Sequence, residues 1–210
     1  ITMDSKSLRE RMTLAKTRVF VNVAFYSAFP EHLKEMRLIV EEGAVAFKLY
    51  LSEKIGGVNI NDDETLSHAF EKAMEMKVPV AVHAEDGEML ERTKERMKRV
   101  GKDDMDAYIR VHSPNAEEKA INRVASLART SGAPIHICHV SSLAGLQDFL
   151  AAKDTGLSIT CEVTPHHLFL SSEDLKRRKT LALTDPPLRS RRNVEALWDA
   201  LKLGLVDTIA

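Results

Sequence analysis

Three residues that can hold a metal ion lie near the ends of apolar, strand-like runs. Lys48 lies in the run 44–51, His83 in 78–85 and His139 in 135–142. Imidazole suits zinc, and a catalytic zinc keeps one position open for water. A desolvated, neutral lysine can react with carbon dioxide to form a carbamate, an anion whose two oxygens can bridge two metal ions. We therefore expect these three residues to share a site for one or two zinc ions.

Each of these residues also has a plainer interpretation. Lys48 can instead reach the rim of the sheet and bind an anionic part of a substrate, and a single histidine is more often a core or rim residue than a ligand. Glu85 and Ser141 are expected to orient the ligands from behind. Arg189 opens a basic run that is either a solvated helix start or part of a loop that closes a pocket.

The remaining histidines are weaker candidates. Neighbouring residues on a strand point in opposite directions, so at most one of His166 and His167 can be a ligand. His136 is expected to point outward, because it differs in parity from His139. The others are predicted to lie at the surface in helices or loops: His32, His68 and His112.

Strand-like runs alternate with amphipathic helical segments along the chain, which predicts a parallel sheet with helices packed outside it. A long connection after the third strand is predicted to hold two helices separated by a polar turn. Strands are predicted at 19–26, 44–51, 78–85, 135–142, 158–164 and from 206; helices are predicted at 5–16, 31–42, 61–76, 86–100, 114–130, from 142, from 171 and through 203.

The parity of side chains within the strands favours a closed barrel over an open sheet. One face of four strands is apolar, whereas the opposite face carries small residues and the candidate site residues, which suits a barrel interior. We predict one α/β domain over residues 1–210, a (β/α)₈ TIM barrel with about six of its eight strands visible. The apolar faces comprise Val19, Val21, Val23 and Phe25; Val45, Phe47, Leu49 and Leu51; Val78, Val80 and Val82; and Ile159, Cys161 and Val163.

The charge balance and the length of the apolar runs restrict the kinds of partner we expect. A formal net charge of −1 gives no electrostatic reason to expect nucleic acid or an anionic membrane as partner. The apolar runs are far shorter than the roughly 18–20 residues that span a bilayer, and we expect a cytoplasmic protein. Cys138 and Cys161 lie in apolar runs and are expected to be buried, reduced thiols.

The chain resembles the dihydroorotases, within the cyclic amidohydrolases that also include allantoinases and hydantoinases. The resemblance rests on residues 43–51 around Lys48, on 82–85, on 135–142, on the Thr-Pro-His-His-Leu run within 160–171 and on Pro-Pro-Leu-Arg at 186–189. The Thr-Pro-His-His-Leu run favours dihydroorotase over allantoinase.

The resemblance implies a zinc-dependent enzyme that interconverts N-carbamoyl-L-aspartate and dihydroorotate in pyrimidine biosynthesis. Lys48 would be the carbamylated bridging lysine, and His83 and His139 would ligate the second zinc. The catalytic aspartate of the family is expected beyond Ala210, together with the end of the eighth strand, and the first strands before Ile1. The 210 residues alone are therefore expected to be inactive. The resemblance also implies a homo-oligomer and an association with aspartate transcarbamoylase.

One residue departs from the dihydroorotase pattern. Asp185 stands where dihydroorotases commonly have an asparagine that contacts the substrate ring. An amide donates and accepts hydrogen bonds, whereas an ionised carboxylate only accepts them. Asp185 is the candidate substrate-binding residue, and it keeps two alternatives open: an allantoinase or hydantoinase (dihydropyrimidinase), and a noncatalytic scaffold subunit with the same fold.

Overall fold

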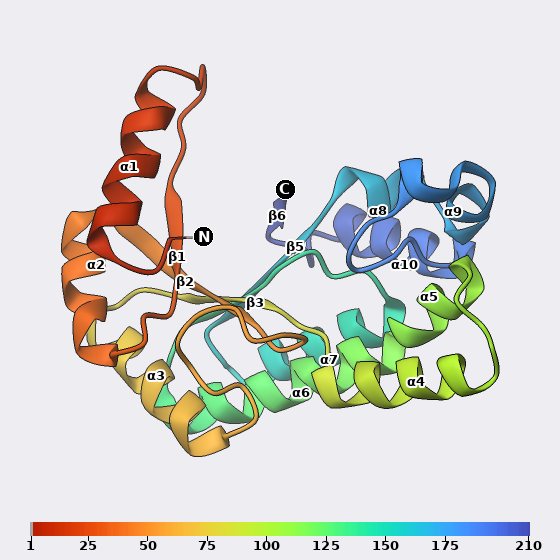
Figure 1. Cartoon of the computed structure of the whole chain (residues 1–210), viewed down its shortest axis with the longest axis horizontal. Coiled ribbons are helices and arrows are strands. Elements are labelled where there is room, and N and C mark those ends of the chain that lie inside the picture. The colour runs from red at the N-terminus through yellow and green to blue at the C-terminus, as the bar shows by residue number, and fades with distance from the viewer. Residues whose placement is uncertain (1) are drawn as a thin grey trace.

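The alternation of strands and helices produces a curled, parallel sheet. The computed structural model describes residues 2–210, and each of its six strands pairs in parallel with the next one along the chain (Figure 1). This sequential order is that of a barrel wall, and the six strands form a curled half-barrel. The strands are β1 (Phe25–Ala28), β2 (Ala44–Tyr50), β3 (Val80–His83), β4 (Ile135–Ile137), β5 (Ile159–Val163) and β6 (Thr208–Ile209).

Several helices begin at a residue whose side chain caps the first turn. The Asp62 side chain accepts hydrogen bonds from the first turn of α3, and the Ser142 side chain does the same for α7. Figure 1 shows α3, α6 and α7 side by side below the sheet. The helices are α1 (Ser5–Lys16), α2 (Met36–Glu42), α3 (Asp63–Glu75), α4 (Gly87–Arg99), α5 (Met105–Val111), α6 (Pro114–Ser131), α7 (Leu143–Asp154), α8 (Pro165–Phe169), α9 (Ser172–Arg178) and α10 (Arg191–Lys202), with 3₁₀ turns η1 (Leu33–Glu35) and η2 (Lys179–Ala182).

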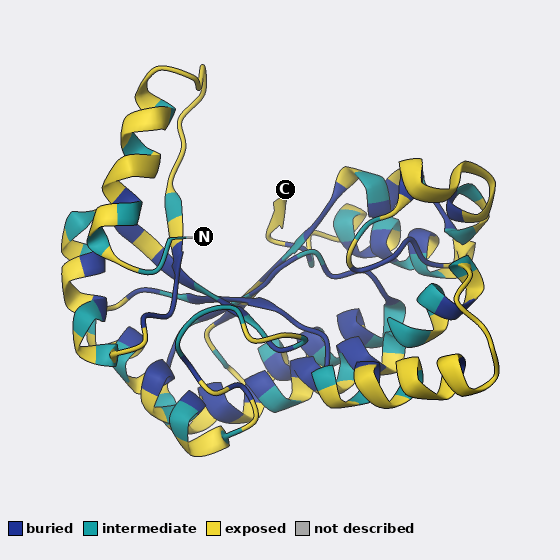
Figure 2. Cartoon of the chain, viewed as in Figure 1, coloured by how far each residue is buried: buried dark blue, intermediate teal, exposed yellow. Residues whose placement is uncertain are grey.

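The two faces of the sheet differ in burial as predicted for a barrel wall. Side chains that face the helices are almost completely buried and form the main core, for example Phe47 and Ile137, both 0% exposed. The opposite face carries half-buried residues, among them Lys48 and His136. Figure 2 shows the buried residues concentrated along the strands and the inner sides of the helices. The core therefore lies between the sheet and its helices, and the inner face is left for the site.

The first strand is shorter than predicted. Residues 19–24 lie outside the sheet on the segment that returns from α1, and β1 begins only at Phe25. Val19, Val21 and Val23 are therefore 42%, 73% and 46% exposed instead of packing against helices. The prediction was wrong because apolar alternation identifies residues suited to a strand but does not show that a neighbouring strand pairs with them.

A β-bulge also changes the parity of β2. Phe25 pairs with Ala44, whereas Tyr26 pairs with Ala46, so Val45 is the extra residue of the bulge. Val45 is 44% exposed, against the prediction that it faces the helices. After the bulge the alternation is regular through Tyr50, which keeps Lys48 on the inner face as predicted.

The connection between β3 and β4 contains a helix that the sequence analysis missed. Residues 105–111 form α5, where we predicted a polar turn. Its N-cap Asp104 accepts a hydrogen bond from the backbone N–H of Ala107. The helix packs against α4 and α9, and the Tyr108 hydroxyl donates to the carbonyl of Thr184 at 2.9 Å. This helix therefore brings the long connection to the loop that carries Asp185.

The structure bears on two predictions from composition. Cys138 and Cys161 are both buried and unpaired, as expected. Burial raises the pKa of the Cys161 thiol to about 12, so this thiol is protonated at neutral pH. Among residues 2–210, the helices are too short or too polar to cross a lipid bilayer.

Candidate metal and substrate site

Two histidines converge at the carboxyl ends of β3 and β4. The Nδ1 atom of His83 lies 3.2 Å from the Nε2 atom of His139. Two imidazole nitrogens that ligate one tetrahedral zinc at about 2.0–2.1 Å lie roughly 3.3 Å from each other. The separation of the two ring nitrogens therefore fits a shared zinc ion as well as a hydrogen bond between the rings.

Glu85 fixes the state of the His83 ring. Its Oε2 atom lies 3.2 Å from Nε2 of His83, and the carboxylate is completely buried. Burial raises the pKa of Glu85, but hydrogen bonds from His112 and His83 outweigh it and hold the pKa well below its usual range. An ionised carboxylate only accepts hydrogen bonds, so the His83 proton lies on Nε2 and the lone pair of Nδ1 faces His139. Glu85 therefore makes the contact with His83 that its predicted orienting role needs.

Lys48 reaches the histidines from a deeper position on β2. Lys48 pairs with Ala81 and Tyr50 pairs with His83, so Lys48 starts two residues below His83, roughly 6.6 Å along the strand. The long side chain spans this difference, because its Nζ atom lies 5.2 Å from the centre of the Tyr50 ring, which itself stacks on His83. The amine therefore lies beside the Tyr50 ring that stacks on His83, and its charge is also among the causes that lower the pKa of His139.

His139 owes its position to an unusual backbone conformation. The strand β4 ends at Ile137, and His139 has a φ of +41°, in the left-handed region that few non-glycine residues adopt. Its backbone N–H donates to Oε1 of Glu162 on β5 at 3.2 Å, which supports this conformation. The sequence analysis did not identify Glu162 as a supporting residue, although its parity placed it on the inner face.

The turn at His139 also explains why the prediction for His136 was wrong. His136 lies on the inner face, paired with Ala81 and Thr160, instead of pointing outward. Its ring contacts Thr160 Oγ1 at 2.9 Å through Nδ1 and Glu162 Oε2 at 3.2 Å through Nε2. His136, Cys138 and Glu162 place potential ligand atoms close together. Both ring nitrogens of His136 are already engaged, so this group supports the wall below the site.

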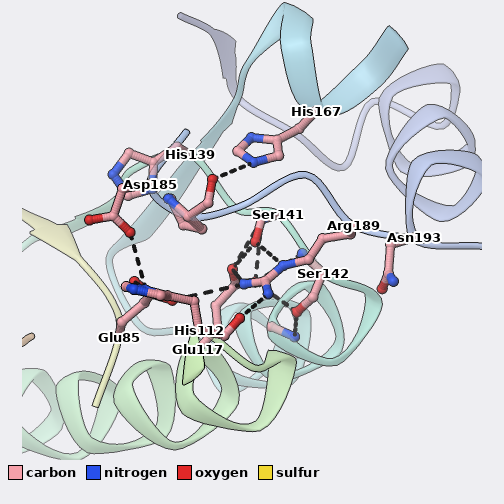
Figure 3. Close-up of polar contacts among 12 residues, drawn as sticks. Glu85, His112, Glu117, His139, Ser141, Ser142, His167, Asp185, Arg189 and Asn193 are labelled. Carbon is pink, nitrogen blue, oxygen red and sulfur yellow. Dashed lines mark hydrogen bonds and ion pairs between the residues drawn. The ribbon is translucent and has the colours of Figure 1, made fainter. Parts of the chain in front are cut away.

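Asp185 and His112 lie together next to Glu85 (Figure 3). Asp185 Oδ2 lies 3.9 Å from His83 Nε2, and Asp185 Oδ1 lies 3.3 Å from His112 Nδ1. His112 Nδ1 also lies 2.9 Å from Glu85 Oε2. His112 was predicted to be a surface residue, and its side chain is only 15% exposed. The missed helix α5 causes the error, because it ends at His112 and directs the ring inward.

Ser141 does not contact either histidine side chain by a hydrogen bond. Its hydroxyl instead contacts Glu117 of α6 and accepts a hydrogen bond from Nε of Arg189 at 2.9 Å. Arg189 is 3% exposed, which agrees with the pocket-loop alternative and excludes the solvated helix start. Any influence of Ser141 on the ligands must therefore pass through these two charged residues.

His167 is buried, but its two nitrogens are already used. Its Nδ1 atom lies 2.8 Å from Thr164 Oγ1, and its Nε2 atom lies 3.2 Å from the carbonyl oxygen of Pro186. Burial lowers the pKa of His167 to about 4. His166, its half-buried neighbour, contacts the same Thr164 hydroxyl. His167 therefore links the end of β5 to the Pro186 loop.

The low pKa of His167 predicts a loss of stability in mild acid. Unfolded histidine titrates near 6.5, so between about pH 6.5 and pH 4 the unfolded state binds the extra proton and folding weakens as pH falls. A shift from the ordinary value to about 4 corresponds to roughly 3 kcal/mol. The free energy of unfolding, measured with urea at pH 7.5 and pH 4.5, should fall less in His167→Gln than in the wild type. An equal fall in both proteins would contradict this prediction.

The donor set fits a zinc ion. Burial, with the neighbouring His83 and Lys48, lowers the pKa of His139 to about 2, so this ring is neutral and able to ligate at neutral pH. His83 presents the lone pair of Nδ1 to the same point. Glu85 and Asp185 also lie near His83, but on its Nε2 side, where Glu85 accepts the proton. A zinc ion would therefore be held by His83 Nδ1, His139 Nε2 and a carbamate on Lys48.

Curated proteins align with almost the whole length of the chain. An allantoinase from Solibacter usitatus (strain Ellin6076) is 36% identical over 182 residues, which cover 86% of this chain and 40% of that protein. An allantoinase from Rubrobacter xylanophilus is 31% identical over 207 residues, which cover 98% and 46%. A dihydroorotase from Methanosarcina acetivorans is 29% identical over 216 residues, which cover 100% and 46%. No family model matches the chain.

Solved structures give the same result for the fold. An L-hydantoinase from Arthrobacter aurescens superposes with a TM-score of 0.92 at 27% identity, covering 100% of this chain and 47% of that protein. A D-hydantoinase from Thermus sp. superposes with a TM-score of 0.90 at 27% identity, covering 98% and 46%. The predicted barrel fold is therefore confirmed as a half-barrel that matches part of a hydantoinase barrel. The chain spans about half the length of the curated relatives it matches.

The names of the relatives change which member of the group the chain resembles most. The Thr-Pro-His-His-Leu run favoured dihydroorotase, whereas the names of the relatives favour the allantoinase and hydantoinase alternatives. Dihydroorotase is also represented, so the reaction class is common to all of them. By sequence and by fold, the chain is similar to about half of a cyclic amidohydrolase, the group of allantoinases, dihydroorotases and hydantoinases.

Proposed function

We propose that the intact protein is a zinc-dependent cyclic amidohydrolase that opens an uncharged ring of the hydantoin or allantoin type. The observation that carries this proposal is the 3.2 Å approach of His83 Nδ1 and His139 Nε2, with Glu85 fixing the proton on the far nitrogen of His83. The position of Lys48 beneath them adds a group that carbon dioxide can convert into an anionic ligand.

The residues of the chain have separate tasks in this proposal. When bound, zinc lowers the pKa of a water molecule towards roughly 7 and polarises the amide carbonyl. His83 and His139 hold the ion, and Glu85 keeps His83 in the tautomer that ligates. Asp185 accepts a hydrogen bond from a ring N–H and so orients the scissile amide. The proton shuttle in this proposal is an aspartate that the resemblance implies.

The charges around Asp185 favour an uncharged ring. Asp185 is half-exposed and lies beside the buried carboxylate of Glu85. Arg189 is turned away from the opening, because its guanidinium donates to Ser141 and to the carbonyl of His112. Dihydroorotate carries a carboxylate, which this acidic side of the site repels, whereas the N–H groups of a hydantoin ring suit a carboxylate acceptor.

Replacement of Asp185 by asparagine tests the substrate choice. The change removes one negative charge and supplies an amide donor, so the ratio of kcat/KM for dihydroorotate to that for allantoin should rise about tenfold. Two charges 4 Å apart interact by about 1 kcal/mol even in water, which is the size of effect expected here. The measurement is turnover of allantoin, hydantoin, dihydrouracil and dihydroorotate by the zinc-loaded intact protein. Asp199→Asn, an exposed change on α10, serves as the control.

The same assay separates the alternatives. Hydrolysis of dihydroorotate alone by the wild type would make the protein a dihydroorotase and refute the substrate proposal. Absence of turnover on every ring, with no zinc bound after reconstitution, would favour the noncatalytic scaffold. The homo-oligomer and the association with aspartate transcarbamoylase stay predictions from the resemblance.

A further inference from the structure

A buried carboxylate holds the loop that follows His139. Glu117 of α6 is 2% exposed, and Ser141 and Ser142 are completely buried. The Glu117 carboxylate accepts hydrogen bonds from the backbone N–H of Ser142 at 3.0 Å and from its hydroxyl at 2.8 Å. It also accepts from the backbone N–H of Ser141 at 3.2 Å and from its hydroxyl. Hydrogen bonds to an ionised acceptor are the strong ones, so the segment two residues after His139 is firmly anchored.

The absence of a side chain at Gly145 makes space for the Glu117 carboxylate. A Cβ atom at Gly145, in the first turn of α7, would clash with Oε1 of Glu117. Any side chain at this position would displace the carboxylate. The close approach of α6 and α7 is therefore built around Glu117, which the sequence analysis did not identify.

Arg189 connects this anchor to the loop that carries Asp185. Its Nε donates to the Ser141 hydroxyl at 2.9 Å, and its Nη1 donates to the backbone carbonyl of His112. Its Nη2 lies 3.6 Å from Glu117 Oε2 and 4.0 Å from Glu85 Oε1. The guanidinium thus lies between two buried carboxylates, as Figure 3 shows for the Glu117 side. We call Glu85, His112, Glu117, Ser141, Ser142 and Arg189 the Arg189 network.

The Arg189 network reaches both candidate ligands and the substrate loop. Glu85 contacts the ring of His83, whereas Glu117 anchors the segment after His139. Asp185 lies four residues before Arg189 and contacts His112. Buried ion pairs contribute little to stability compared with apolar replacements, because desolvation offsets the attraction. The main effect of this network is therefore on geometry. It fixes the end of β3, the segment after His139 and the Asp185 loop relative to one another.

We propose that Glu117 and Arg189 are positioning residues, which set the zinc affinity of the His83–His139 pair and the placement of the Asp185 loop. Neither residue touches the metal or the ring. Glu117 acts mainly on His139 through Ser141 and Ser142, and Arg189 acts mainly on Asp185 through their shared loop. The effect on turnover rests on the proposed function, whereas the effects on zinc binding and on loop order do not.

The two residues should give different signatures in the intact protein. Glu117→Gln keeps the shape but removes the charge, and we expect zinc affinity, measured by chelator competition, to fall about 10- to 100-fold. Arg189→Lys keeps the charge but loses the planar fork, and we expect KM to rise about tenfold with a smaller change in zinc affinity. Hydrogen exchange of residues 139–145 and 184–189 should accelerate in both variants. Neighbouring exposed or half-exposed positions supply the matched controls, Glu118→Gln and Arg192→Lys.

The outcomes separate this inference from the proposed function. General destabilisation would lower the melting temperature without the split between zinc affinity and KM. If Glu117→Gln does not fold, Ser141→Ala tests the same link, because it keeps the backbone hydrogen bonds and removes the hydroxyl between Glu117 and Arg189. Unchanged zinc affinity and unchanged exchange in folded variants would overturn the inference. If the wild type binds zinc but opens no ring, the proposed function fails, and zinc affinity and exchange still decide the role of the network.

Discussion

Replacement of Lys48 by arginine in the intact protein is expected to reduce hydrolysis about 10³-fold and to lower the bound zinc. Arginine keeps the positive charge and most of the length of lysine, but its guanidinium stays protonated and cannot form a carbamate. A lysine that only binds a substrate anion would tolerate this change with a modest rise in KM. The arginine variant therefore distinguishes the two interpretations of Lys48 that the sequence left open.

The measurement combines kcat/KM with zinc content after reconstitution in buffer with and without bicarbonate. Removal of carbon dioxide should slow the metal loading of the wild type and leave Lys48→Arg unaffected. Lys48→Ala should regain part of its activity with a short carboxylic acid, which supplies the missing oxygens. Lys54→Arg, in the loop after β2, is the control. Near-normal turnover and zinc content in Lys48→Arg would show that no carbamate is involved.

Replacement of His139 by alanine should cause a loss of similar size for a different reason. It removes Nε2, one of the two nitrogens that lie 3.2 Å apart, so zinc binds weakly and the supply of hydroxide near neutral pH falls with it. We expect kcat/KM to fall about 10³-fold or more and zinc content to fall well below that of the wild type. The histidine control is His68→Ala, whose side chain is 57% exposed on α3.

The zinc content of His139→Ala decides how the result is interpreted. A protein that folds, binds zinc with wild-type affinity and still loses activity would make His139 a substrate contact and not a ligand. A circular-dichroism melt checks that folding is preserved. Addition of imidazole, which can occupy the space left by the side chain, should restore part of the zinc affinity.

Much of the sheet and part of the site followed from side-chain alternation. Lys48 lies in the regular part of β2, after its bulge, and His83 lies on the regular strand β3, so parity placed both on the inner face. Strand parity does not account for the position of His139, because its left-handed backbone turns the side chain to the face opposite to the one that parity predicts. The same turn explains why His136 was wrongly expected to point outward. Backbone conformations of this kind depend on tertiary contacts, here with Glu162, which a single sequence does not reveal.

The remaining features depended on contacts between distant segments. His112 is drawn into the site by α5, a helix of seven residues in a polar stretch whose sequence suggested only a turn. Glu117 looks like any acidic residue on an amphipathic helix until Ser141 and Arg189 are placed beside it. Val19 to Val23 alternate like a strand, yet pairing with a neighbour decides whether such residues join a sheet. Patterns along the chain therefore predicted which candidate residues lie together better than they predicted the residues that support them.

The most direct test of the central claim is the crystal structure of the intact protein reconstituted with zinc and bicarbonate, with data collected at the zinc absorption edge. We predict an anomalous peak about 2.0–2.1 Å from both His83 Nδ1 and His139 Nε2, and density for a carbamate on Lys48 Nζ that reaches the same ion. An anomalous peak between His136, Cys138 and Glu162, or an unmodified Lys48 beside a fully loaded zinc site, would contradict this account.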